Sequence, residues 1–289
     1  MSDKSHKSKI KDLCKIISKI SPSLSFTIFE IGALPVEGQE EPFHSLVDYF
    51  PGSQIIAFEI DKTLCKELNK KAKPGMKYYP AALGYKEEQR VFYETAHPMC
   101  CSLYKPNEEL MKKYNNLEVA MLKSTNTITT TSLDNFVDNY SIAGADFIKI
   151  DIQGAELDVF KGSTNVLEEV VFIVSEVEFI PLYIDQPLFG DICKYLSEKN
   201  FMFHKFLGIG GRTIRPILMD DNPNFANQHM WSDAVFIREI NKLSELSSSK
   251  LLKMGILSYI YRSPDVSFLC LKIYDEREST NISQEMFMI

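Results

Sequence analysis

The chain has 289 residues, of which 45% are hydrophobic and 25% charged, and its formal net charge is -7 at pH 7. A chain of this length and composition buries a sizeable core and is too apolar to be intrinsically disordered. The acidic balance argues against a general nucleic-acid binder, because such proteins present a basic face to phosphate.

Residues 1–24 are basic, and their apolar residues recur at helical spacing between Ile10 and Ile20. This spacing predicts a basic N-terminal helix that packs on the following domain. A basic amphipathic helix lying on a membrane surface is the alternative.

Residues 25–240 alternate short apolar runs with helical patterns. The predicted strands are SFTIFEIGA (25–33), QIIAFEID (54–61), KYYPAALG (77–84), FIKID (147–151), VVFIVSEVEF (170–179), FMFHKFLGIGG (201–211) and DAVFIREI (233–240). Strands that alternate with helices indicate βαβ units, and so an α/β fold with a mostly parallel sheet covered by helices on both faces.

Two stretches within this region, and the last part of the chain, depart from the alternation. Residues 89–104 alternate weakly and predict an inserted hairpin, and residues 107–126 are polar and predict a mobile connection. Residues 127–139 predict a strand that runs into a helix. Residues 241–289 predict a helical C-terminal appendage.

Several predicted strands end in carboxylates. The first ends in Glu30, the second in Glu59, the strand 147–151 in Asp151, and the next in Glu176 and Glu178. Ligands of open parallel sheets bind outside the carboxyl ends of the strands, so we expect a ligand site at this edge. Carboxylates repel one another, which favours a cationic ligand or a metal ion there.

The turn after the first strand, EIGALPVEG, lacks the GxGxxG fingerprint of dinucleotide-binding proteins. Gly32 stands alone with Gly38 some residues later, and Glu30 and Glu37 would repel a phosphate. Glu59, at the end of the second strand, has the position of an acid that holds ribose hydroxyls. A ligand that contains adenosine, has no phosphate and carries a positive charge fits the description of S-adenosylmethionine.

With these features the sequence resembles the FkbM family of S-adenosylmethionine-dependent methyltransferases. The blocks that match in order are FEIGA, AFEID, AALG, CSLY, TTTSLDNF, FIKIDIQGAELDVFKG, SEVEFIPLYIDQPLF and WSDAVFIRE. They extend over roughly residues 25–239. The first block departs from the family, because Glu30 replaces the usual aspartate and Leu34-Pro35-Val36 replaces small residues. Cofactor contacts by residues 34–38 are therefore left open.

The resemblance implies a Rossmann-like sheet of about seven strands with the last one antiparallel. It also implies methyl transfer from S-adenosylmethionine to a hydroxyl oxygen of a sugar, a glycan or a polyketide-type small molecule. A non-catalytic methyltransferase-like module that binds a partner is the alternative.

The resemblance assigns cofactor contacts position by position. Glu30 and Gly32 would approach the methionine moiety, Glu59 would hold the ribose hydroxyls, and Ala82 and Leu83 would flank the adenine. The predicted cofactor-binding residues are Glu30, Gly32, Ala33, Glu59, Ile60, Ala82, Leu83 and Asp151.

Asp151, which would face the methyl-transfer site, is the first candidate for the base or the acceptor-orienting group. The alternative is that it only pairs with Lys149, which points to the same side of the strand and needs an ionic partner if buried. Lys149 is itself a less favoured catalytic candidate, as a general base or a Schiff-base lysine. Glu156 either belongs to the site or stabilises the N-terminus of the following helix. Glu178, on one strand face with Glu176, is a further catalytic candidate. A magnesium ion between Asp151 and Glu178 is a less favoured alternative.

Other side chains have both a functional and a packing interpretation. His44 and His204 are alternative bases, and the two arginines of GIGGRTIRP (208–216) offer a site for an anionic group such as a uronate or a phosphate. Trp231 and Asp233 either line the acceptor pocket or pack against the sheet. We expect loops 95–126 and 208–230 to choose the acceptor.

The six cysteines are scattered, without a Cys-x-x-Cys pair or zinc spacing, and the N-terminus lacks the apolar core of a signal peptide. These features predict reduced thiols in a cytoplasmic protein. No run reaches the roughly 20 apolar residues of a membrane span. We therefore expect a small-molecule or glycan acceptor as partner, no nucleic acid and no integral membrane segment, and leave a homodimer open.

Overall fold

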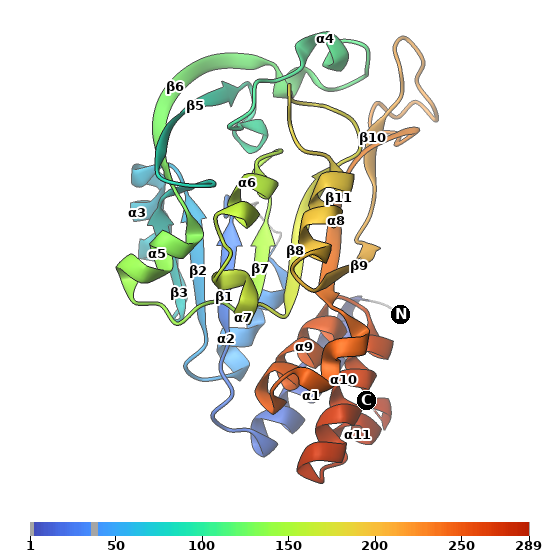
Figure 1. Ribbon diagram of the computed structural model, residues 1–289. Coiled ribbons are helices and arrows are strands. Elements are labelled where there is room, and N and C mark those ends of the chain that lie inside the picture. The colour runs from blue at the N-terminus through green and yellow to red at the C-terminus, as the bar shows by residue number, and fades with distance from the viewer. Residues whose placement is uncertain (1–2, 36–39, 289) are drawn as a thin grey trace.

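The computed structural model describes residues 3–35 and 40–288, so Glu37 and Gly38 of the first turn lie outside the described residues. The central sheet is built from β1 (Thr27–Ile31), β2 (Gln54–Glu59), β3 (Met76–Pro80), β7 (Phe147–Ile150), β8 (Phe172–Glu178), β9 (Phe201–Phe206), β10 (Gly210–Arg212) and β11 (Gln228–Arg238). Its strand order is β10-β11-β8-β7-β1-β2-β3, and β9 also pairs with β11 (Figure 1).

The neighbours from β3 to β8 all pair in parallel, whereas β11 is antiparallel to β8. The predicted Rossmann-like α/β sheet with an antiparallel last strand is therefore confirmed. Alternate residues of the central strands are buried on opposite faces, as for Ile28 and Phe29 of β1. Burial on both faces explains the nearly continuous apolar runs in the sequence.

The edge beside β11 differs from the prediction of one strand over 201–211. The chain breaks at Gly208, which has φ +136, so that β9 and β10 pair with different parts of β11. At Gly210 a Cβ atom would lie 2.2 Å from the Trp231 ring, so this contact requires glycine. The sheet consequently has eight strands rather than about seven.

Helices cover both faces of the sheet. One face carries α1 (Asp3–Ile20), η1 (Pro42–Ser45), α2 (Leu46–Tyr49), α3 (Lys62–Lys71), η4 (Ile240–Glu245), α9 (Ser248–Ile260), α10 (Pro264–Glu278) and α11 (Ile282–Met288). The other face carries α5 (Leu133–Tyr140), α6 (Glu156–Lys161), α7 (Val166–Glu169) and α8 (Phe189–Ser197). Among the described residues, no helix is long and apolar enough to cross a membrane.

The terminal helices share one hydrophobic core with the sheet. Leu13 and Ile17 of α1 and Leu251 of α9 belong to the same buried cluster as Phe147 of β7 and Phe172 of β8. The apolar side of α1 is thus occupied by the domain, as expected for a packed helix, and is not left for a membrane surface. The division at residues 24 and 240 stays a prediction, because these helices pack on the sheet itself.

An arch lies above the carboxyl ends of the parallel strands (Figure 1). It consists of β5 (Glu88–Thr95) and β6 (Leu122–Thr131), which pair antiparallel, with the short β4 (Ala82–Leu83) parallel to β6. The predicted hairpin over 89–104 is present only as one antiparallel bridge between Tyr93 and Ser102, because the main partner of β5 comes from 122–131. After β5 the chain turns at Pro98 into η2 (Pro98–Cys100) instead of a returning strand.

The prediction that residues 107–126 form a mobile connection is also wrong. It contains α4 (Glu108–Met111), η3 (Glu118–Ala120) and the start of β6. Met111 and Tyr114 are buried against Tyr183 and Met230 in a small separate core. Apolar residues spaced among polar ones are enough to order the segment once distant residues cover them.

Candidate functional site

A cleft of about 680 Å³ lies between the carboxyl ends of β1 and β2 and the β5–β6 arch. Its floor contains six of the eight predicted cofactor-binding residues, namely Gly32, Glu59, Ile60, Ala82, Leu83 and Asp151. Its roof includes Phe92, Glu94, Lys123, Asn126 and Ile128 of the arch. The structure therefore brings together residues that the sequence separates by more than a hundred positions.

Glu59 ends β2 with its carboxylate held in a fixed direction. Its Oε1 accepts hydrogen bonds from the backbone N–H groups of Ile60 at 2.8 Å and Asp61 at 3.1 Å. Asp61 in turn caps α3 by accepting from the N–H groups of Thr63 and Leu64. Both bonds to Glu59 use the same oxygen, so within the described part of the chain its Oε2 is available to a ligand.

Gly32 allows the ends of β1 and β7 to approach each other at the cleft. It has φ +80, and a Cβ atom there would lie 1.9 Å from the carbonyl oxygen of Asp151. Only glycine satisfies both the conformation and the contact.

We expect Gly32→Ala to lower the free energy of unfolding by about 2–4 kcal/mol, through backbone strain and overpacking. Chemical denaturation measures this change. Gly190→Ala is the control, because a Cβ atom at Gly190 in α8 meets nothing within 4 Å. Equal stability of the two variants would contradict the close approach.

Asp151 follows β7 and is held by Lys149, as the sequence predicted. The Nζ of Lys149 lies 3.3 Å from Asp151 Oδ2. Burial alone would lower the pKa of Lys149, but Asp151, Asp233 and other carboxylates raise it above its ordinary value. Burial would likewise raise the pKa of Asp151, but the Lys149 ammonium and hydrogen bonds hold it below its ordinary value. Asp151 is therefore an ionised carboxylate at neutral pH.

Gln153, which the sequence argument missed, connects the carboxylates. Its Nε2 donates to Asp151 Oδ1 at 2.9 Å and also to Glu176. Its Oε1 accepts from the Tyr183 hydroxyl at 3.1 Å, and its backbone carbonyl accepts from Ser102 Oγ at 2.6 Å. The only sequence signal was its place between Asp151 and the turn glycine, because its partners come from distant segments.

Glu156 closes the turn between β7 and α6. It is fully buried, and its two oxygens accept the backbone N–H groups of Ile152 at 2.8 Å and Gly154 at 2.9 Å. Burial raises the pKa of Glu156 to about 8. Since Glu156 is fully buried, holds the turn and lines neither of the two cavities, the geometry favours a positioning role for it over direct catalysis.

The raised pKa of Glu156 makes its contribution to folding pH-dependent. The contribution is full below the unfolded pKa of about 4.3 and is lost as pH rises through about 8. We expect wild type to lose stability relative to Glu156→Gln between about pH 5 and pH 8, because glutamine does not titrate. Thermal unfolding across this range measures the difference, with the exposed Glu109→Gln as control. Parallel pH profiles for wild type and Glu156→Gln would contradict this assignment.

Glu176 and Glu178 lie behind the cleft rather than in its lining. Burial, followed by the charge of Asp151, raises the pKa of Glu176 well above its ordinary value. Burial, followed by the charge of Glu156, does the same to the pKa of Glu178, which is 1% exposed. Within 3–35 and 40–288, no group of three or more His, Cys, Asp or Glu side chains is arranged to hold a metal ion.

A second cavity of about 570 Å³ adjoins the cleft at Gly32 and Asp151. It contains the other two predicted cofactor-binding residues, Glu30 and Ala33. His44 also lines it, with Nε2 2.9 Å from Glu30 Oε2. The remaining charged residues of its lining are Glu40, Glu41, Lys71, Lys73, Lys149 and Asp233.

The other histidine candidate lies elsewhere. His204 of β9 is 2.8 Å from the Ser263 hydroxyl at the start of α10, and burial lowers its pKa. It lines neither cavity. Asp233 lines the second cavity, as expected, whereas Trp231 packs over Gly210.

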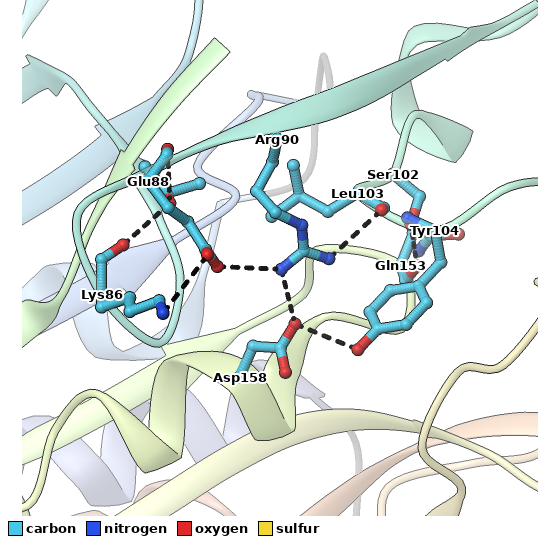
Figure 2. Close-up of polar contacts among 9 residues, drawn as sticks. Lys86, Glu88, Arg90, Ser102, Leu103, Tyr104, Gln153 and Asp158 are labelled. Atoms are coloured by element: carbon cyan, nitrogen blue, oxygen red, sulfur yellow. Dashed lines mark hydrogen bonds and ion pairs between the residues drawn. The ribbon is translucent and has the colours of Figure 1, made fainter. Parts of the chain in front are cut away.

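The arch is tied to α6 by a charged cluster (Figure 2). Arg90 of β5 reaches Asp158 of α6 at 3.2 Å, and the Tyr104 hydroxyl donates to the same Asp158 oxygen at 3.0 Å. Arg90 also lies 3.7 Å from Glu88. Since α6 follows the Gln153 turn directly, these contacts fix the roof of the cleft relative to Asp151.

Comparisons with known proteins identify the family of the chain. The model of the family described as the methyltransferase FkbM domain matches residues 30–203, which confirms the resemblance expected from the sequence. The hexuronic acid methyltransferase AglP of Haloferax volcanii is 36% identical over 72 residues. That match covers 25% of this chain and 28% of the relative.

Two solved structures show a distant likeness to this chain. LepI in complex with S-adenosylmethionine is 9% identical with a TM-score of 0.33, over 80% of this chain and 46% of LepI. The 23S rRNA methyltransferase ErmE is 11% identical with a TM-score of 0.31, over 92% of this chain and 97% of ErmE. Likenesses this distant carry no argument about function, and the fold rests on the sheet order itself.

Proposed function

The chain belongs to the FkbM methyltransferase family, whose model matches residues 30–203, and we propose that it transfers the methyl group of S-adenosylmethionine to a hydroxyl oxygen of a sugar. The observation that carries the proposal is the cleft with Glu59 at one side and Asp151 at the other, joined by Gly32, Ala82 and Leu83. This arrangement offers a hydrogen-bond acceptor for the ribose hydroxyls, an apolar surface for the adenine ring and a carboxylate beside the position of the reacting methyl group.

The residues of the cleft fit S-adenosylmethionine better than a dinucleotide. Glu59 Oε2 is free to accept a ribose hydroxyl, and Ala82 and Leu83 offer apolar surface to adenine. Gly32 and the carboxylates near it suit a methionine moiety with a positive centre and would repel a pyrophosphate. When bound, this cofactor supplies an electrophilic methyl group on a sulfonium.

In the proposed reaction Asp151 orients the acceptor hydroxyl and takes its proton. A carbon–oxygen bond forms as the carbon–sulfur bond breaks, and the hydroxyl proton passes to the Asp151 carboxylate. Asp151 suits this role because Lys149 and Gln153 keep it ionised and aligned. Alignment of acceptor and base supplies most of the rate gain in such a displacement.

Two observations support a sugar as acceptor. The AglP relative is a hexuronic acid methyltransferase, although it shares only 72 aligned residues. The second cavity also carries several carboxylates, which accept hydrogen bonds from the hydroxyls of a polyol. The proposal includes a cytoplasmic location and a small-molecule or glycan acceptor rather than a nucleic acid.

The proposal is tested by incubating the protein with S-adenosylmethionine and a panel of methyl glycosides, followed by mass spectrometry of the products. We expect one sugar hydroxyl to gain a methyl group. Cofactor binding without transfer to any sugar, polyketide or other hydroxylated acceptor would instead support a non-catalytic binding module.

A further inference from the structure

The segment after Gly208 brings an arginine to the edge of the sheet where Asp151 lies. In β10, Gly210 pairs with Trp231 of β11, and Trp231 pairs on its other side with Glu178 at the end of β8. Because β11 is antiparallel to β8, its first residues lie at the carboxyl edge of the parallel strands. The strand β10, which contains Arg212, lies at this same edge (Figure 1).

The guanidinium of Arg212 is held against an aromatic ring. It lies 5.0 Å from the centre of the Trp231 ring, a cation–π distance. Its Nη1 donates to the Gly211 carbonyl at 2.7 Å and its Nε to the Asn116 carbonyl at 3.4 Å. These contacts fix the plane of the guanidinium and provide no countercharge.

Arg238 also lacks a carboxylate partner, but its Nε, Nη1 and Nη2 all donate to backbone carbonyls, whereas Arg212 uses only Nε and Nη1 within the described residues. Two further arginines have ionic partners. Arg90 pairs with Asp158, and Arg215, three residues beyond Arg212, pairs with Glu118. Among the residues that the structure describes, Arg212 has no carboxylate partner, although it is half-buried. Burial lowers its pKa, which is the electrostatic cost of placing a cation there without an anion.

A small core connects Arg212 with the residues around Asp151. Trp231, on which Arg212 is stacked, and Cys100 both pack against the core that contains Tyr183. The Tyr183 hydroxyl donates to the Cys100 carbonyl and to Gln153, which in turn donates to Asp151. Arg212 and Asp151 are therefore connected through Trp231, Tyr183 and Gln153.

We propose that Arg212, oriented by Trp231, forms a subsite that binds the carboxylate of an acidic sugar and so makes hexuronic acids the preferred acceptors. This inference rests on the proposed sugar methyltransferase function. A guanidinium binds a carboxylate through two parallel hydrogen bonds. An anionic acceptor needs such a local cation, because the ionised Asp151 would repel it and the nearby Lys149 is already paired with Asp151.

The subsite predicts a change in acceptor preference rather than in cofactor use. The experiment compares wild type with Arg212→Met on paired methyl glycosides: glucoside with glucuronide, galactoside with galacturonide, and mannoside with mannuronide. We expect Arg212→Met to lower kcat/KM about 10- to 100-fold on the uronide that wild type prefers. The kcat/KM on the neutral glycoside of the same pair and the KM for S-adenosylmethionine should be unaffected. Arg212→Lys should lose less than Arg212→Met, since lysine keeps the positive charge but lacks the two parallel N–H donors of the guanidinium.

Arg215→Met is the matched control, because Arg215 belongs to the same segment and already has an ionic partner. It should leave the ratio of uronide to neutral turnover at the wild-type value. The inference is overturned if Arg212→Met leaves that ratio unchanged, or if wild type prefers the neutral sugars. In both cases sugar methylation itself stands. If wild type binds the cofactor but methylates no sugar of either kind, the proposed function fails and the subsite fails with it.

Discussion

Asp151→Asn is expected to lower kcat by about 10²- to 10⁴-fold and to weaken the affinity for S-adenosylmethionine far less. Asparagine keeps the shape of the side chain and its contact with Gln153, but it does not accept the acceptor's proton. Because Lys149 and Gln153 hold the pKa of Asp151 low, wild-type kcat should not fall until the pH drops below the ordinary range of an aspartate. The loss in Asp151→Asn should therefore be present at every pH where wild type is active.

Steady-state kinetics with S-adenosylmethionine and the preferred acceptor measure this loss. The exposed Asp185→Asn is a suitable control, since Asp185 already has φ +61, which asparagine adopts readily. Thermal unfolding of Asp151→Asn separates catalysis from stability, because the variant leaves Lys149 without its closest partner. A kcat close to wild type would contradict the role of Asp151 as a base.

Glu59→Ala is expected to weaken binding of S-adenosylmethionine by about 100-fold, with a smaller effect on kcat at saturating cofactor. The proposed contact is a hydrogen bond from ribose to a charged acceptor, worth about 1.5–3 kcal/mol. Alanine also removes the acceptor of the Ile60 and Asp61 N–H groups and loosens the start of α3. Calorimetric titration measures the change in Kd.

Two further variants sharpen this result. Glu59→Gln keeps one acceptor oxygen and should lie between wild type and alanine. Glu67→Ala, on the exposed side of α3 and paired there only with Lys70, should bind the cofactor as wild type does. Equal Kd values for wild type and Glu59→Ala would contradict the placement of ribose at Glu59.

The strands and their terminal carboxylates were predictable because both signals are local. A strand buried on both faces reads as an apolar run, and Glu59 and Asp151 follow from where such runs end. Parallel pairing then brings these ends to one edge, whichever residues lie between them. The same reasoning gave the ion pair of Lys149 with Asp151, since alternate side chains share one side of a strand.

The arch and the hydrogen bonds around Gln153 were not predictable, because they depend on partners far along the chain. The alternation in 89–95 is the same whether β5 pairs with the next residues or with 122–131. Gln153 acquires its role from Ser102 and Tyr183, which are 51 and 30 positions away. Periodicity within a segment carries no information about such contacts.

The terminal helices show that local sequence patterns also do not reveal which surface a helix packs against. The apolar spacing of α1 was visible in the sequence, but not the surface that it covers. The sequence 251–261, LLKMGILSYIY, is strongly apolar although far shorter than a membrane span, and the structure shows why it is so apolar. Most of α9 is buried between neighbouring helices and the sheet. A helix that is apolar on all sides requires such surroundings.

A crystal structure of the complex with S-adenosylhomocysteine would test the central claim most directly. We expect the nucleoside in the cleft beneath the β5–β6 arch, with the ribose hydroxyls on Glu59, the adenine against Ala82 and Leu83, and the sulfur directed toward Asp151. A nucleoside bound outside this cleft, or one whose sulfur points away from Asp151, would contradict the account.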